Sequence, residues 1–364
     1  MEFNFFMPVR IVAGDNCVKK NAHLFAAFGR RALVVTGKSS ARNGALEDVV
    51  WAFNQNGRQY EVYDAVPQNP TVACVEEGAR LARGMRADFV VAIGGGSPMD
   101  AAKAVAMLAR QGSDGSIFTR EISADVLPMI HIPTTAGTGS EVTPYAILNN
   151  DEKQTKTSIS APSLFPKIAF LDAKYTAGLP LSVTVNTAID AISHAVEGML
   201  SVRAGELSDA VARESLGHLF SAYGALRGGE LTHADRCELL YGAALAGVVI
   251  ANTGTTPVHG MGYCLTYFHG VPHGRANGLL LPAFLRVCAR KDPTRTARVF
   301  AALGMDADAF ADKLAALLGP RECYADATLH DYARRAAANK NIKNCAVPME
   351  EADLYEVFKA SVGA

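Results

Sequence analysis

Two patterns of hydrophobic and polar positions divide the chain near residue 178. Before this point, short apolar runs alternate with stretches whose apolar residues recur every three or four positions. The short runs predict strands, and the recurring spacing predicts helices. Strands are expected at 31–37, 60–66, 88–96 and 128–135, and helices at 47–57, 75–85 and 99–110. Strands that alternate with helices indicate a parallel sheet with helices on both faces.

After residue 178 the apolar positions keep helical spacing, and β-branched runs become rare. Helices are expected at 179–200, 209–226, 236–252, 297–303, 307–318 and 329–339. We therefore predict an α/β domain at residues 1–178 and an all-helical domain at residues 179–364. A length of 364 residues suits two domains.

Composition limits the classes of partner. The 35 Lys and Arg balance 36 Asp and Glu, so the net charge of -1 gives no reason to expect nucleic acid or an anionic membrane. The N-terminus lacks the basic and apolar regions of a signal peptide, and no apolar run approaches the ~18 residues of a membrane span. The seven cysteines are scattered without a C-x-x-C pair, which indicates reduced thiols. We therefore expect a cytoplasmic protein.

Two glycine-rich turns follow predicted strands. The stretch AIGGGSPMDAAK, residues 92–103, leads from a strand through Gly94–Gly96 and Ser97 into a helix. Glycines let a phosphate approach the backbone, and the N–H groups of the next helix can hold it. The stretch PTTAGTGSEVT, residues 133–143, offers two glycines and five hydroxyl residues after another strand. One such turn is often only a connection, but two in one parallel sheet indicate a nucleotide or dinucleotide.

The first predicted strand ends without a carboxylate. NAD-binding sheets often place an acidic residue there to bind the ribose hydroxyls. Here Gly37 is followed by Lys38, Ser39, Ser40 and Arg42, a set that would admit the 2'-phosphate of NADP. An ordinary exposed polar loop is the alternative interpretation.

Acidic and histidine side chains mark a candidate metal site in the second half. Asp190 and His194 lie four positions apart in an apolar helical frame, which places both on one face. Two ligands of one divalent ion need this geometry, although a buried Asp–His hydrogen bond would also explain it. Glu197 shares the face and is a candidate partner of a ligand.

Three further histidines, His259, His269 and His273, lie in VHGMGYCLTYFHGVPHG, residues 258–274. On one straight helix His259 and His273 would be ~21 Å apart, too far to share an ion. Gly270 and Pro272 break the helix, so the chain can return His273 to the side of His259. We treat His269 as outside the set. One carboxylate and three imidazoles suit iron(II) or zinc.

The motifs GGGSPMDAAK, PTTAGTGSEVT, DAISH and H-x13-H-G, in this order, resemble the iron-containing, or group III, alcohol dehydrogenases. The resemblance extends over essentially the whole chain. It implies the fold shared with dehydroquinate synthase, which has a Rossmann-like dinucleotide-binding domain followed by an all-helical domain. It also implies a site in the cleft between the domains and assembly into a homodimer.

Carried over position by position, the resemblance implies the metal ligands Asp190, His194, His259 and His273. It implies cofactor contacts at Asn69, Gly95, Gly96, Ser97, Asp100, Thr134, Thr135, Thr138, Thr143 and Lys156. Gly37 stands where NAD-preferring members carry Asp, which favours NADP(H), with NAD(H) as the other option.

One position departs from the common family pattern. Tyr263 stands where many members carry a second histidine that relays a proton, and tyrosine is a weaker base near neutral pH. A subset similar to NADP-using 1,3-propanediol dehydrogenases also carries Tyr. Tyr263, His269 or water remain candidates for moving the proton.

The expected activity is hydride transfer between NADP(H) and a small primary alcohol, diol or aldehyde, with Fe2+ or, as the alternative, Zn2+ acting on the substrate oxygen. A zinc- and NAD-dependent polyol enzyme like glycerol dehydrogenase is the nearest alternative. A lyase like dehydroquinate synthase would need several cationic side chains for its anionic substrate, and only Arg275 and Lys291 stand out near the ligands. A binding module that has lost catalysis is the non-enzymatic alternative.

Overall fold

The protein is described here by a computed structural model, which covers residues 3–38 and 42–364. It forms two compact units, one spanning Met7–Leu179 and the other Pro180–Ala364 together with residues 3–6. The backbone N–H of Phe6 donates to the side-chain oxygen of Asn252 at 2.7 Å, which ties the start of the chain to the helical unit. The chain therefore passes from one unit to the other at Leu179–Pro180.

The first unit is built on a six-stranded sheet with the order β1-β8-β5-β4-β2-β3, in which every pair is parallel. Its strands are β1 (Arg10–Ala13), β2 (Arg31–Thr36), β3 (Gln59–Tyr63), β4 (Phe89–Gly94), β5 (Met129–Pro133) and β8 (Ile168–Leu171). The connecting helices are α1 (Cys17–Lys20), α2 (Ala45–Gln55), α3 (Val72–Gly84) and α4 (Gly96–Gln111). Strands β6 (Tyr145–Asn150) and β7 (Thr155–Ser160) form a separate antiparallel hairpin.

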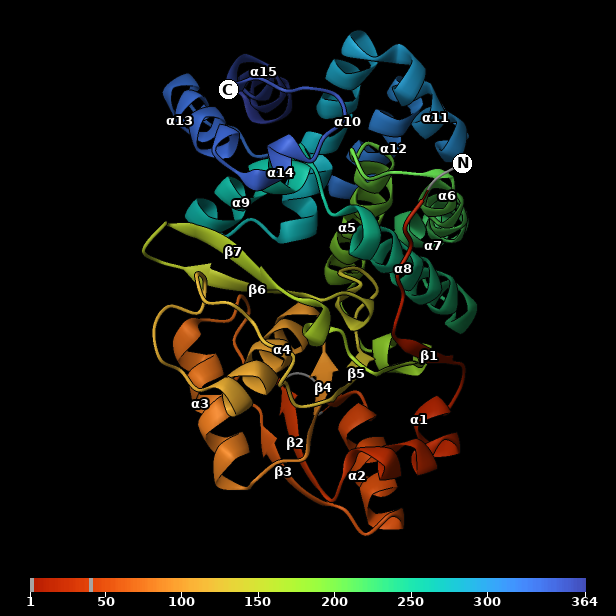
Figure 1. The fold of residues 1–364 in the computed structure, drawn as a ribbon. Coiled ribbons are helices and arrows are strands. Elements are labelled where there is room, and N and C mark those ends of the chain that lie inside the picture. Colours follow the sequence, from red (N-terminus) through yellow and green to blue (C-terminus); the bar gives the residue numbers. More distant parts are fainter. Residues whose placement is uncertain (1–2, 39–41) are drawn as a thin grey trace. The chain divides into compact units, whose positions relative to one another are not determined.

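Helices cover both faces of this sheet, as the alternating pattern predicts (Figure 1). Along β2, Leu33 and Val35 pack with α3 and α4, whereas Ala32 and Val34 pack with α1 and α2. Successive side chains of a strand point to opposite faces, so a strand buried on both sides is apolar throughout. The Rossmann-like fold class expected from the sequence is confirmed.

The helical unit consists of α-helices that pack on one another. They are α5 (Leu181–Met199), α6 (Glu206–Ser221), α7 (Tyr223–Gly228), α8 (His233–Thr253), α9 (Pro257–His269), α10 (His273–Lys291), α11 (Pro293–Leu303), α12 (Ala307–Leu318), α13 (Asp326–Ala337), α14 (Lys340–Lys343) and α15 (Glu351–Val362). Helix α5 packs against both α8 and α10, and α10 packs against α9. The helix predicted at 209–226 is in fact two helices, because α6 ends before Ala222 and α7 begins after it.

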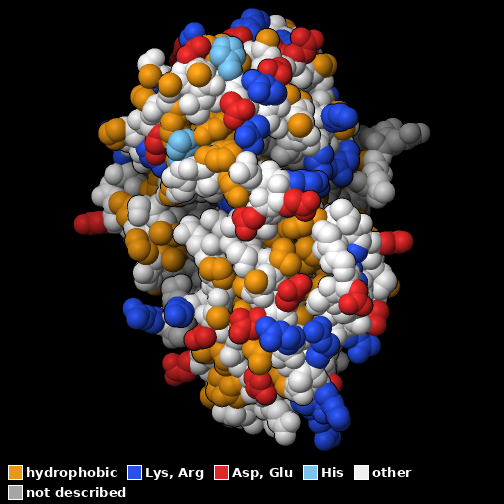
Figure 2. Space-filling model, turned by 90° about the vertical axis from the view of Figure 1, so that its left-hand side faces the viewer, with side chains coloured by type: hydrophobic (Ala, Val, Ile, Leu, Met, Phe, Trp, Pro, Cys, Tyr) orange, Lys and Arg blue, Asp and Glu red, His pale blue; other side chains and the backbone are white. Residues whose placement is uncertain are grey.

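The surface charge and the length of the apolar helices were compared with what a charged partner or a membrane would require. On the face drawn in Figure 2, Lys and Arg side chains mix with Asp and Glu. Within the described ranges, no single helix is long and apolar enough to cross a bilayer; α8 and α9 pass that test only as a pair bent by 111°.

Candidate functional site

Three helices bring four side chains together in the helical unit. Asp190 and His194 project from α5, His259 lies in the first turn of α9, and His273 begins α10. Gly270, with a φ of 66°, ends α9 in the left-handed conformation that favours glycine, and Pro272 then starts α10. The chain thus reverses between α9 and α10, as the sequence predicts, and the rings of His259 and His273 lie 5.1 Å apart.

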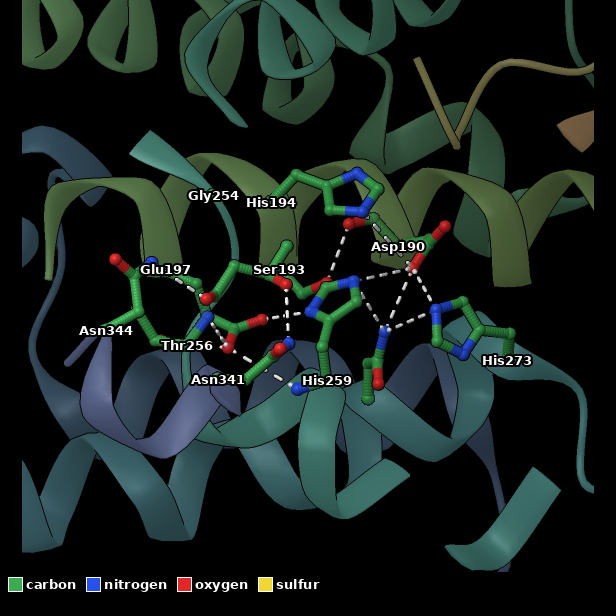
Figure 3. Close-up of polar contacts among 12 residues, drawn as sticks. Asp190, Ser193, His194, Glu197, Gly254, Thr256, His259, His273, Asn341 and Asn344 are labelled. Carbon is green, nitrogen blue, oxygen red and sulfur yellow. Dashed lines mark hydrogen bonds and ion pairs between the residues drawn. The ribbon is translucent and has the colours of Figure 1, made fainter. Parts of the chain in front are cut away.

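The polar atoms of these side chains converge on one carboxylate oxygen (Figure 3). The Nε2 atoms of His259 and His273 both lie 3.7 Å from Oδ1 of Asp190, and Nε2 of His194 lies 4.0 Å from it. The ligand atoms of Asp190, His259 and His273 are all within 4.8 Å of one another. The ring of His194 stacks on that of His259 at 4.7 Å. Asp190, His259 and His273 therefore form one compact group of possible ligand atoms, and His194 lies at its edge, within 4.0 Å of the same carboxylate oxygen.

Glu197 fixes the orientation of His259. Its Oε2 accepts from Nδ1 of His259, and its Oε1 accepts from the backbone N–H and the hydroxyl of Thr256, each at 2.9 Å. Because a carboxylate can only accept, Nδ1 carries a hydrogen, and in the neutral ring, the form that binds a metal, Nε2 faces Asp190 with its lone pair. Asn344 holds the segment before α9 by donating to the carbonyls of Thr253 and Thr255 at 2.9 Å.

The electrostatics of the group follow from its burial. Burial alone would raise the pKa of Asp190, but His194, His273 and His259 hold it well below its usual range. Burial alone would lower the pKa of His259, but the carboxylates of Glu197 and Asp190 outweigh it and raise that pKa to about 9. The protein thus favours an ionised carboxylate beside positive charge at this position.

The donor set fits a divalent transition metal. Imidazole nitrogen and carboxylate oxygen are ligands of iron and zinc, and a carboxylate that orients a ligand histidine is a common feature of such sites. Asp190, His194 and His259 are each less than 5% exposed, so these donors are shielded from competing water.

The two candidate proton carriers lie in different surroundings. The ring of Tyr263 stacks on that of His273 at 5.7 Å, which places Tyr263 directly beside the converging group. His269 lies at the other end of α9, where its Nε2 is 2.6 Å from the hydroxyl of Tyr332 and its ring stacks on Tyr324. Neither Tyr332 nor Tyr324 belongs to the group around Asp190.

In the sheet unit the two predicted glycine turns touch each other. A Cβ atom at Gly95 would lie 3.0 Å from the hydroxyl oxygen of Thr135, and a Cβ atom at Gly96 would lie 2.8 Å from the methyl carbon of Thr138. Gly95 is the N-cap residue of α4, a helix of sixteen residues. No side chain caps the first N–H groups of this helix. The first N–H groups of a long helix and the hydroxyls of the neighbouring turn therefore adjoin, which suits a phosphate.

Three more of the predicted cofactor residues lie together beside this turn. The backbone N–H of Asn69 donates to Oγ of Ser97 at 3.2 Å, and Nζ of Lys156 donates to the side-chain oxygen of Asn69 at 2.8 Å. Asn69 has a φ of 59°, a conformation that asparagine tolerates better than most residues. Lys156 adds a cation that suits the same anionic ligand.

Asp100 and Thr143 lie in a buried cluster instead. Oδ1 of Asp100 accepts from the hydroxyl of Ser140 at 2.6 Å, and Oδ2 accepts from the N–H of Ile147 at 3.1 Å. Nζ of the fully buried Lys103 donates to Ser140 and to the carbonyl of Tyr145, and it lies 3.5 Å from the hydroxyl of Thr143. Both carboxylate oxygens of Asp100 are thus bonded inside the protein, and its predicted cofactor contact remains a prediction.

The end of β2 is closely packed. A side chain at Gly37 would come 3.3 Å from the carbonyl of Val66. Lys38 follows at the surface, whereas the predicted Ser39 and Ser40 lie outside the described residues. The N–H of Thr134 bonds the carbonyl of Gly94, so its backbone links β5 to the first glycine turn.

Sequence reasoning passed over two buried residues of these clusters. Asn277 lies four positions after His273 on α10, and its Nδ2 is 3.0 Å from Oδ1 of Asp190. Lys103 follows Asp100 by three positions on α4. In both cases the three- or four-residue helical spacing from a chosen residue was the available signal.

Comparisons with known proteins agree with this geometry. The family model for iron-containing alcohol dehydrogenase matches residues 8–173, and the C-terminal model of the Fe-containing alcohol dehydrogenase family matches residues 184–360. The chain is 34% identical to the lactaldehyde reductase of Escherichia coli strain K12 over 262 residues, which cover 71% of this chain and 68% of that protein.

Solved structures share the whole fold. An iron-containing alcohol dehydrogenase from Thermotoga maritima is 36% identical with a TM-score of 0.91, and the match covers 100% of both chains. A sulfoacetaldehyde reductase from Bifidobacterium kashiwanohense, solved in complex with NAD+, is 28% identical with a TM-score of 0.89 and 99% of both chains covered. The chain therefore belongs to the iron-containing alcohol dehydrogenase family and is an oxidoreductase of alcohols and aldehydes.

Proposed function

We propose that this protein is a metal-dependent aldehyde reductase and alcohol dehydrogenase that transfers a hydride between NADP(H) and a small primary alcohol, diol or aldehyde. The observation that carries the proposal is the convergence of three imidazoles on Oδ1 of Asp190. The family membership and the glycine turns at the start of α4 support it.

Asp190, His194, His259 and His273 would hold the ion, which we take to be iron(II), with zinc also suited to the set. The ion would supply Lewis acidity toward the substrate oxygen, and a nicotinamide dinucleotide would supply the hydride chemistry. Glu197 keeps the Nε2 lone pair of His259 directed toward Asp190. Burial of Asp190, His194 and His259 limits the water that would compete for the same position.

We assign the proton route to Tyr263 rather than His269. A phenol can both donate and accept a hydrogen bond, and the Tyr263 ring lies on the ring of His273. In aldehyde reduction the hydroxyl can therefore give its proton to the product oxygen and regain one from water. In alcohol oxidation it can take a proton from the alcohol while passing its own to water. His269 lies with Tyr332 and Tyr324, apart from that group.

Metal analysis and a coenzyme panel test the proposal. Protein purified without oxygen should carry about one iron or zinc per chain and oxidise NADPH with short aldehydes faster than NADH. Protein that binds neither metal and shows no turnover after either is added would contradict it. Zinc with NADH and polyols would favour the glycerol dehydrogenase alternative.

The coenzyme preference rests on Gly37 and its neighbours, so the variant Gly37→Asp tests it separately. A carboxylate at the end of β2 would bind ribose hydroxyls and repel a 2'-phosphate. The ratio of kcat/KM for NADPH over NADH should fall at least tenfold, an effect of roughly 1.4 kcal/mol. An unchanged ratio would show that the end of β2 does not select the coenzyme.

A further inference from the structure

The amide of Asn277 lies over the group that we propose as metal ligands. Its Nδ2 is 3.0 Å from Oδ1 of Asp190, 3.2 Å from Nε2 of His259 and 3.3 Å from Nε2 of His273. These are the same three atoms that converge within 4.8 Å of one another. They come from α5, α9 and α10, so one amide nitrogen contacts all three helices that build the site.

The orientation of this carboxamide follows from its partner. An amide nitrogen can only donate, and an ionised carboxylate can only accept. Turning the carboxamide over would place its oxygen against Oδ1 of Asp190, two acceptors facing each other. Asn277 is fully buried, so no bulk water would relieve that contact. The N–H side therefore faces Asp190.

Helix α9 confines the carboxamide from the other side. A side-chain carbon at Gly262 would come 2.4 Å from Oδ1 of Asn277, closer than such atoms approach in real proteins. Gly262 has no φ in the left-handed region that would require glycine, and it lies in the middle of a helix. The close approach of Asn277 is thus the reason for glycine at this position.

We propose that Asn277 is a positioning residue that donates to Asp190 and so holds this carboxylate beside the imidazoles of His259 and His273. A carboxylate oxygen has two lone pairs, so the bond to Asp190 leaves one for an ion. Each imidazole Nε2 has a single lone pair, so the longer contacts to His259 and His273 give way when an ion binds. Asn277 thereby holds Asp190 toward the two histidines before and after loading. This inference rests on the proposed metal site.

Two variants act on Asn277 by different routes. Asn277→Leu keeps a similar volume and removes the donor. Gly262→Ala removes no polar group and favours the helix, since alanine is the better helix former, but it displaces the carboxamide. If Gly262→Ala loses metal affinity, a weakened helix therefore cannot be the cause, because the substitution stabilises the helix. Asn150→Leu is the matched control, because Asn150 is a buried asparagine of β6 whose amide donates to Thr157.

The readout is Zn2+ affinity, measured on chelator-stripped full-length protein by competition with a chromophoric chelator. The visible spectrum of the Co2+-loaded protein is recorded in parallel. We expect both test variants to bind Zn2+ about tenfold to a hundredfold more weakly and to shift the Co2+ bands, as removal of a group that orients ligands does elsewhere. Asn150→Leu should match the wild type in both.

The outcomes separate this inference from the proposed function. Wild-type protein that takes up no Zn2+ would overturn the metal site and this inference with it. Wild-type binding that Asn277→Leu and Gly262→Ala leave unchanged would overturn the role of Asn277 alone. If Asn277→Leu does not fold, Gly262→Ala decides the question by the same readouts.

Discussion

The two units each bury a polar cluster, and the clusters differ in what balances their charge. In the sheet unit, Asp100 is matched by the ammonium group of Lys103, 3.6 Å away, and by the hydroxyl of Ser140. In the helical unit, the carboxylate of Asp190 lies against three imidazoles and one amide. In the first cluster the charge of Asp100 is balanced by Lys103. In the second, the imidazole nitrogens all lie around the same oxygen of Asp190. We infer that the first positions the glycine turns and the second binds a cation.

The largest effect is expected from removal of the shared carboxylate of the second cluster. Asp190→Ala should abolish metal retention and reduce kcat/KM by at least about a thousandfold, because Lewis acidity is worth several kcal/mol in the transition state. Metal content and aldehyde reduction are measured together, with circular dichroism as the control for folding. Full activity in metal-stripped Asp190→Ala would refute the assignment.

The first cluster should respond in stability instead. Lys103→Met leaves the carboxylate of Asp100 buried without its cation, and should lower the free energy of unfolding by about 3–5 kcal/mol. The metal content should stay unchanged. Urea unfolding compares this variant with Lys20→Met, in which an exposed lysine is replaced.

A double variant sharpens that result. Replacing both Asp100 by Asn and Lys103 by Met removes the charges together, so it should be more stable than Lys103→Met alone. A double variant less stable than the single one would show that the pair does not act as a neutralised unit.

Glu141, which lies beside this cluster, makes stability depend on pH. Burial raises the pKa of Glu141 to about 7, against 4.5 for an ordinary glutamate. Between these values the unfolded chain binds fewer protons than the folded one, so the free energy of unfolding falls as pH rises from 4.5 to 7. The total decrease in the free energy of unfolding is roughly 3 kcal/mol, and Glu141 causes no further decrease above pH 7.

Glu141→Gln should remove this fall. Urea unfolding of wild type and variant at several pH values between 4 and 8 measures it. Parallel curves for the two proteins would mean that Glu141 ionises normally in the folded state.

The smallest effect is expected from Glu197, which contacts a proposed ligand rather than the ion. Glu197→Gln weakens the hold on Nδ1 of His259 and should lower metal affinity about tenfold to a hundredfold, with the fold intact. Chelator competition on the stripped protein measures the change. Affinity equal to that of the wild type would show that His259 is oriented without a carboxylate at position 197.

Sequence patterns predicted the central strands and most helices, because a strand buried on both faces is apolar throughout and a packed helix repeats its apolar positions. They missed β1, β8 and the hairpin β6–β7. The four residues of β1 and of β8 are too few to show a period, and β6 alternates buried and half-buried residues without a clear polar face.

The site was predictable where spacing within a helix or a helix break decides the geometry. Asp190 with His194 followed from a four-residue spacing, and the return of His273 followed from Gly270 and Pro272. The contacts of Asp100 and Asn277 depend on which neighbouring element each side chain meets, and a one-dimensional pattern contains no such information. Asp100 illustrates this limit, since its partners Ser140 and Ile147 lie forty or more residues away.

Anomalous diffraction tests the central claim most directly. Crystals of protein purified without oxygen would be measured on either side of the iron and zinc absorption edges. The account predicts one strong peak per chain within bonding distance of Asp190, His194, His259 and His273. A metal peak bound by other residues, or none at this position in crystals of active enzyme, would contradict it.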